Sequence, residues 1–187
     1  MKKEELQNYP KLAPAELEEA LETAVSQTRF SMSRFGTGFK HIFSTNHFYT
    51  EAPNNQWTNG FWTGQLWLAY ECSGDPEMKR TALAQTQSFR YRIDHQIETD
   101  THDLGFLYTP SCVAAWKLTG SEEAKETAIK AARRLLERFH EKGQFLQAWG
   151  KPDEPGNYRL IIDCLLNLPL LYWAGEVTGD RIYREKA

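Results

Sequence analysis

The chain has 187 residues, which suits a single domain over residues 1–187 with a substantial core. Its formal net charge is only −3, so the basic surface that nucleic-acid binding requires is missing, and no nucleic-acid partner is expected. Aromatic residues make up 13% of the chain, a content that suits either a packed core or platforms on which sugar rings stack.

Neither a targeting segment nor a membrane span is predicted. The first residues, MKKEELQNYPKL, are charged but lead into no apolar run. The longest apolar stretch, residues 160–175, is interrupted by polar side chains and by Pro169. We therefore expect a cytoplasmic protein with no membrane partner. Three cysteines are expected to be small buried residues in a reducing compartment: Cys72, Cys112 and Cys164.

The predicted elements are almost all helical. Apolar periodicity predicts a first helix from Pro14 to Phe35, and a second segment, residues 57–73, is apolar nearly all round. That segment contains Gly60 and Gly64, each of which costs about 1 kcal/mol relative to alanine in a helix. We interpret both glycines as places where a neighbouring helix or a ligand comes too close for a side chain.

Further along the chain, two more apolar helices are predicted at residues 106–119 and 160–178, and amphipathic helices follow Pro76 and Ser121. The segment FRYR at 89–92 lies on one of the amphipathic helices and is predicted to form a solvated face. Residues 144–149, QFLQAW, are the single strand candidate.

A repeated turn organises these helices. At three places an apolar helix ends in Ser or Thr and then glycine, which can take the left-handed conformation that ends a helix, and a capping residue follows at once. The pairs are Gly74–Asp75, Gly120–Ser121 and Gly179–Asp180. The repeat indicates helical hairpins, as in an open α-solenoid or a closed ring. Apolar helices before each turn and amphipathic helices after it favour an inner ring wrapped by an outer ring, so we predict an all-α toroid.

Three unusual segments are expected at one mouth of this ring. Trp57 and Asp103 each precede their turn glycine by 17 residues, and Asp163 precedes its own by 16. At about 1.5 Å per residue, each lies roughly 25 Å from its turn, at the opposite end of an inner helix. A pair of carboxylates beside an aromatic platform is what glycosidic-bond chemistry requires.

The surroundings of the acids suggest different roles. Asp163 is flanked by apolar residues 160–165, so we expect it to be desolvated with a raised pKa, as a general acid needs. His102 could orient Asp103 or bind an anionic group. Two other interpretations stay open: both acids could simply favour helix starts, and Asp100, His102 and Asp103 could form a partial metal site.

The segments WTNGFWTGQLWLAYE, HDLGFLYTPSC, QAWG and YRLIIDCLLNLPLL, in this order and spacing, closely resemble the unsaturated glucuronyl hydrolases, glycoside hydrolase family 88. The resemblance runs from about Leu12 onward and implies a six-hairpin (α/α)6 barrel in a bacterial cytoplasm. It implies removal of the unsaturated uronic acid at the non-reducing end of lyase-generated glycosaminoglycan fragments, by hydration of the C4=C5 double bond. No metal or organic cofactor is implied.

Carried over by motif, Asp163 would be the proton donor and would activate water, and Asp103 would be the second essential carboxylate. Substrate contacts would come from Trp57, His102, Asn59 and Arg159.

Family members are about twice as long, so the resemblance covers an amino-terminal half, about half of the six hairpins. This incomplete domain would hold both acids but not the whole pocket, which makes activity of the chain alone uncertain. The inner helix at 160–179 would lack a neighbour on its far side, and we expect an apolar edge that pairs two copies of the chain. Two alternatives remain: a non-catalytic helical-repeat module that binds a sugar or a protein, and an unsaturated rhamnogalacturonyl hydrolase.

Overall fold

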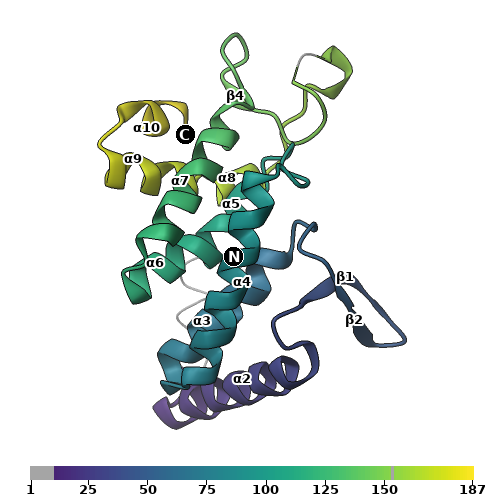
Figure 1. Cartoon of the computed structure of the whole chain (residues 1–187), viewed down its shortest axis with the longest axis vertical. Helices are drawn as coiled ribbons and strands as arrows, with labels where there is room; N and C mark the ends of the chain where they lie inside the picture. Colours follow the sequence, from purple (N-terminus) through teal and green to yellow (C-terminus); the bar gives the residue numbers. More distant parts are fainter. Residues whose placement is uncertain (1–10, 153) are drawn as a thin grey trace.

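The computed structural model describes residues 11–152 and 154–187 as a set of helical hairpins with two small β-hairpins (Figure 1). In chain order the elements are α2 (Pro14–Phe35), β1 (Phe39–Thr45), β2 (Phe48–Ala52), α3 (Asn59–Ser73), α4 (Pro76–Asp94), α5 (Leu104–Tyr108), the π-helical turn η1 (Thr109–Val113), α6 (Ala114–Thr119), α7 (Glu122–Leu136), β3 (Phe139–His140), β4 (Phe145–Leu146), the 3-10 turn η2 (Pro155–Asn157), α8 (Cys164–Asn167), α9 (Pro169–Thr178) and α10 (Arg181–Lys186).

The helices form two layers, and the repeated turn connects them as predicted. The inner layer consists of α3, then α5, η1 and α6, then α8 and α9; the outer layer consists of α2, α4, α7 and α10. Each turn glycine is left-handed, with φ between 69° and 72°, and the side chain after it accepts a hydrogen bond from the start of the next helix. Inner and outer helices therefore alternate along the chain, as they do in a helical toroid.

Glycines let the inner helices meet backbone to backbone. A Cβ on Gly60 would lie 2.6 Å from Cα of Leu107, and one on Gly64 would lie 2.8 Å from the Pro110 ring. Gly105 faces the backbone of Asn167 in the same way. The interpretation of Gly60 and Gly64 is thus confirmed, and the close neighbour in both cases is the helix that follows in the inner layer.

A β-hairpin between α2 and α3 was not predicted from the sequence. Strands β1 and β2 pair antiparallel through a two-residue turn at Asn46 and His47, both of which have positive φ. Most of its side chains are exposed, so the hairpin lacks the alternating apolar pattern that betrays a half-buried strand. The predicted strand at 144–149 is present in shortened form as β4, paired with β3.

Three further expectations need correction. The helix predicted from residue 160 begins only at Cys164 and is interrupted before Pro169. Cys72 is exposed, whereas the other two cysteines are buried. The FRYR segment is not wholly solvated, because Phe89 and Arg92 turn inward and are buried.

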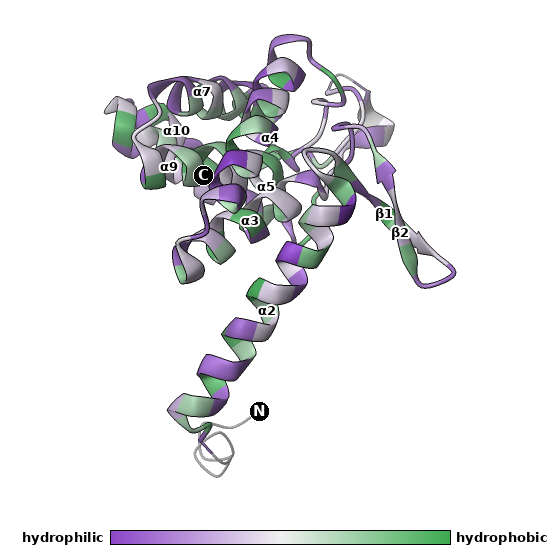
Figure 2. Ribbon diagram, turned by 60° about the horizontal axis from the view of Figure 1, so that its bottom comes forward, coloured by the Kyte–Doolittle hydropathy of each residue, from purple (hydrophilic) through white to green (hydrophobic). Residues whose placement is uncertain are grey.

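Helix α2 reaches beyond the other helices at its N-terminal end (Figure 2), while its middle lies against the end of α3, where Leu21, Val25 and Cys72 line a shared pocket. Phe35, in its last turn, is the one buried residue of this helix, and apolar residues nearer its N-terminus, such as Leu17 and Leu21, are exposed. No helix in the described part of the chain is long and apolar enough to cross a membrane.

Candidate active site

The two predicted acids meet at the start of neighbouring inner helices. Asp103 directly precedes α5 and Asp163 directly precedes α8, and neither side chain caps its helix. His102 lies between them: its Nε2 is 3.2 Å from Oδ1 of Asp103 and 3.6 Å from Oδ1 of Asp163. One atom from each of the three residues lies within 4.8 Å of the other two. Neither acid therefore caps its helix through its side chain, whereas a favourable interaction with the helix dipole does not depend on such a bond.

Asp103 is held in place by its own loop. The hydroxyl of Thr101 donates a 2.8 Å hydrogen bond to Oδ2 of Asp103 and accepts one from the Asp103 backbone N–H. Between these two residues, His102 donates its backbone N–H to the carbonyl of Ala148 at 2.8 Å. Asp103 is therefore anchored through its side chain and its backbone, and His102 through its backbone.

His102 carries the positive charge of the site. Its side chain is 1% exposed, and burial alone would lower its pKa. The neighbouring side chains of Asp103 and Cys164 and the charges of Asp103 and Asp163 outweigh burial and raise the pKa of His102 to about 9. The ring is therefore an imidazolium at neutral pH, placed between the two acids, and this charge suits either of the two roles expected for it.

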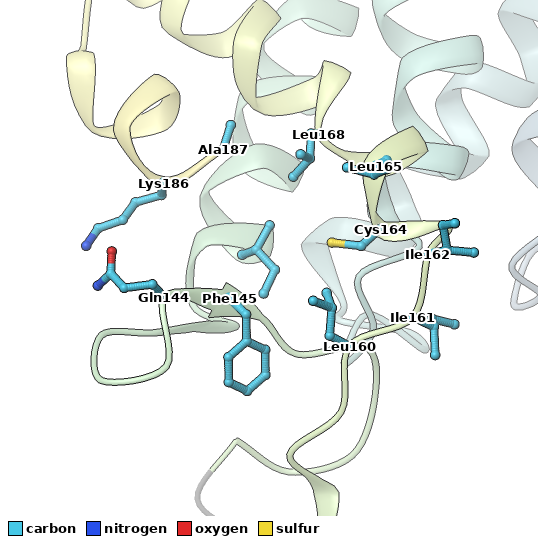
Figure 3. A pocket seen from close by; sticks show the side chains of 11 residues that line it. Gln144, Phe145, Leu160, Ile161, Ile162, Cys164, Leu165, Leu168, Lys186 and Ala187 are labelled. Carbon is cyan, nitrogen blue, oxygen red and sulfur yellow. The ribbon is translucent and has the colours of Figure 1, made fainter.

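Asp163 is the more accessible acid, with a side chain 34% exposed against 18% for Asp103. The expected apolar enclosure of Asp163 is wrong for this chain, because Leu160, Ile162 and Leu165 are exposed, Ile162 to 87%. These residues instead line a pocket of about 420 Å³ beside the α8 start, together with Cys164 and the end of the chain (Figure 3). The flanking sequence was apolar, but its side chains lie on the surface of the described chain.

Asn167 joins the two acid-bearing helix starts and was missed from the sequence. Fully buried, it accepts a 2.8 Å hydrogen bond from the backbone N–H of Phe106 and donates to the carbonyl of Asp163 at 3.2 Å. Its backbone also packs against Gly105. A buried amide inside the apolar run LLNLPLL was the signal that could have identified it.

Trp57 lies on an aromatic surface that includes Phe106 of α5. Its ring is 5.9 Å from that of Phe106 and 6.1 Å from that of Phe61, and the side chain is 46% exposed. Phe106 follows Asp103 by three residues in α5. The structure thus places Trp57 against α5, the helix that follows Asp103, whereas Trp67 is buried in the core.

The other two predicted substrate contacts occupy different environments. Asn59 is 1% exposed, and its Oδ1 accepts a 2.8 Å hydrogen bond from the backbone N–H of Gln56, so it shapes the turn before α3. Arg159 lies over the ring of Trp149 at 5.0 Å, and its carbonyl accepts from the Ala148 N–H. Substrate contact by either residue stays a prediction.

The metal alternative depends on which acid joins His102. Asp100 turns away and pairs with Arg134, so the set of Asp100, His102 and Asp103 is not assembled. The set that is assembled contains Asp163 instead. A cation in this set would have to displace a proton from the His102 ring, whose pKa is raised to about 9.

No protein-family model matches the chain, but individual known proteins do. It is 48% identical over 176 residues to an unsaturated chondroitin disaccharide hydrolase of Streptococcus pyogenes, covering 94% of this chain and 44% of that protein. It is 43% identical over 171 residues to an unsaturated glucuronyl hydrolase of Bacillus sp. GL1, covering 91% and 45%.

Solved structures agree with these relatives. The unsaturated glucuronyl hydrolase of Streptococcus agalactiae superposes with a TM-score of 0.94 at 48% identity, covering 97% of this chain and 46% of that one. The Bacillus sp. GL1 enzyme gives a TM-score of 0.86 at 42% identity, covering 90% and 45%. A variant of the S. agalactiae enzyme was solved with dGlcA-GalNAc6S. The chain spans about half the length of the relatives it matches.

Proposed function

Because the chain belongs to the family of unsaturated glucuronyl hydrolases, we propose that it carries the acid pair of such an enzyme. The reaction would remove an unsaturated uronic acid from the non-reducing end of lyase-generated glycosaminoglycan oligosaccharides. Water would add across the C4=C5 double bond, with a proton to C4 and a hydroxyl to C5, and the resulting hemiketal would open and release the neighbouring sugar.

The observation that supports this proposal most is the placement of the His102 imidazolium between two carboxylates from successive inner helices. The positive ring offsets negative charge at the site, so two acids can lie close together without full repulsion. Asp163, the more exposed of the two, is the acid that a sugar reaches, and we assign it proton donation and water activation. Asp103 is the second carboxylate, and Trp57 offers a face on which the sugar ring stacks.

The test is to incubate the purified chain with unsaturated chondroitin disaccharide and follow the ultraviolet absorbance of the double bond. In a version of the chain extended with a family-type second half, we expect Asp163→Asn to lower the rate at least about 100-fold, since an amide cannot supply the proton. Asp180→Asn is the matched control. Asp180 also precedes a helix, but it is the N-cap of α10, and asparagine can cap a helix as well.

Two outcomes would contradict the assignment. A rate within tenfold of the unsubstituted chain for Asp163→Asn would remove Asp163 from the chemistry. Binding of the disaccharide without any loss of absorbance would instead make the chain a non-catalytic sugar-binding module.

We further propose a cytoplasmic location, one domain over residues 1–187, and pairing of two copies through an apolar edge. The edge, which we call the α8 edge, has exposed apolar side chains within and just before α8: Leu160, Ile161, Ile162, Leu165 and Leu166. Apolar patches of this kind are uncommon on soluble monomers and mark interaction surfaces. A second copy would bring the same side chains to the edge and cover it.

A further inference from the structure

Arg92, on the outer helix α4, is a buried cation with an unusual set of partners. Its side chain is almost fully buried, and its guanidinium donates four hydrogen bonds to oxygens that are all uncharged. Nε bonds the carbonyl of Ile97 at 3.0 Å, and Nη2 bonds that of Glu98 at 3.1 Å. Nη1 bonds Oδ1 of Asn54 at 3.1 Å and the carbonyl of Gln56 at 3.0 Å.

These oxygens belong to two loops that carry the candidate site. Residues 53–58, the Trp57 loop, lead into α3, and residues 95–103, the His102 loop, lead from α4 to α5. The two loops are far apart along the chain, and Arg92 bonds both of them at once. One guanidinium therefore connects the aromatic face of the site to its acidic side.

On the Trp57 loop, the bond from Arg92 ends at the residue next to the tryptophan. Gln56 accepts from Arg92 at its carbonyl, donates its N–H to Asn59 at 2.8 Å, and accepts from the Ile42 N–H at its side-chain oxygen, also at 2.8 Å. Because the carbonyl, the N–H and the side chain of Gln56 are each hydrogen-bonded, the adjacent backbone of Trp57 is held in place as well.

On the His102 loop, Arg92 supports backbone in an unfavourable conformation. Gln96 and Glu98 are non-glycine residues with φ of 54° and 47°, a region that side chains rarely adopt. Arg92 holds the carbonyls of Ile97 and Glu98 within this segment, and its own carbonyl accepts the Ile97 N–H at 3.0 Å. The bonds hold the strained turn from which the loop proceeds to His102.

Burial of a charge without a bonded carboxylate is costly, and burial lowers the pKa of Arg92. A lysine could not replace it, because an ammonium donates from one point, whereas the planar fork reaches oxygens on both sides. We propose that Arg92 is a positioning residue that sets the separation between Trp57 and the His102–Asp103 pair, and with it the width of the mouth. The part that concerns the sugar rests on the proposed function; the part that concerns the two loops does not.

The test compares Arg92→Lys with Arg90→Lys in the full chain by amide hydrogen exchange. Arg90 is on the same helix but pairs with Asp94 and Glu123 at the surface, so it controls for the loss of a guanidinium. We expect Arg92→Lys to speed exchange at least about tenfold in residues 54–58 and 97–103, while the interiors of α3 and α7 are unaffected. Unchanged exchange in the two loops would overturn the proposal, as would a uniform increase over the whole chain, which a merely structural role predicts.

A second readout addresses the sugar. Titration with unsaturated chondroitin disaccharide should show a dissociation constant raised about tenfold or more for Arg92→Lys and unchanged for Arg90→Lys. Equal affinity in both variants would overturn the link between Arg92 and the width of the mouth. If the unsubstituted chain does not bind the disaccharide, the proposed function fails, while the exchange experiment still decides whether Arg92 positions the loops.

Discussion

Replacing Gly105 with alanine should push the two candidate acids apart. Gly105 lies two residues after Asp103, and its backbone faces Asn167, four residues after Asp163. A Cβ at this position would lie 2.7 Å from the carbonyl carbon of Asn167 and closer still to two other atoms of its backbone. Since ordinary Cβ contacts begin at 3.4 Å, the starts of α5 and α8 must separate by about 1 Å.

The size of the effect follows from what this contact supports. Overpacking of this kind typically costs about 1–3 kcal/mol, and rigid backbone on both sides places Gly105→Ala in the upper part of that range. The bond from the Phe106 N–H to Asn167 would stretch as well, for about 1 kcal/mol more. We therefore expect the free energy of unfolding to fall by about 3–4 kcal/mol. A displacement of 1 Å between catalytic groups can lower a rate about 100-fold.

The assay is urea denaturation of the unsubstituted chain, of Gly105→Ala and of Gly156→Ala, followed by circular dichroism. Gly156 is the control because a Cβ there would meet no atom within 4 Å, and its substitution should change stability by less than about 0.5 kcal/mol. NMR titration of His102 gives a second measurement, since its pKa should fall as Asp163 moves away. Stability within 0.5 kcal/mol of the parent and an unchanged His102 pKa would refute the reasoning.

Three other predictions concern the charge, the aromatic face and the exposed edge. The raised pKa of His102, about 9 against 6.5, should stabilise the fold by at most about 3 kcal/mol, fully below pH 6.5 and no longer once the pH rises through 9. Urea denaturation from pH 6 to 10 should show this loss in the parent but not in His102→Asn; parallel profiles would contradict it. Trp57→Ala should weaken disaccharide binding about tenfold while costing less than about 2 kcal/mol of stability, against about 3–5 for Trp67→Ala in the core. A loss of that larger size at Trp57 would place it in the core. Light scattering at micromolar concentration should show a dimer. The substitution Ile162→Ser, in the α8 edge, should weaken this dimer, and a monomeric parent would contradict pairing.

Local chemistry made the helical hairpins predictable. A glycine that can turn left-handed and a side chain that can accept the next N–H act over four or five residues, so Gly74 and Asp75 define a helix boundary in any tertiary context. Inner and outer helices differ in how many of their faces are buried, and apolar periodicity reports that difference directly. The meeting of Asp103 and Asp163 then followed from counting residues back from each turn.

Other features depended on contacts between distant segments. Arg92 is charged, like the exposed residues of an amphipathic helix. It is buried because two loops remote in the chain present carbonyl oxygens to it. The exposed hairpin of β1 and β2 is held by backbone pairing, which side-chain patterns report poorly. Asp163 appeared desolvated because its neighbours in sequence are apolar, but desolvation depends on neighbours in space, and Ile162 points to solvent.

By itself, then, the sequence determined the hairpin repeat, the two layers, the glycine contacts and the acids at one mouth, because each of these depends on spacing within a helix or on the chemistry of one turn. The tertiary structure alone decided that His102 stands between the acids as a cation, that Asn167 ties their helices together and that Arg92 spans two loops. Hydrogen bonds and charge interactions are short-ranged and directional, so they form only once folding has brought residues far apart in the chain within about 3 Å of one another.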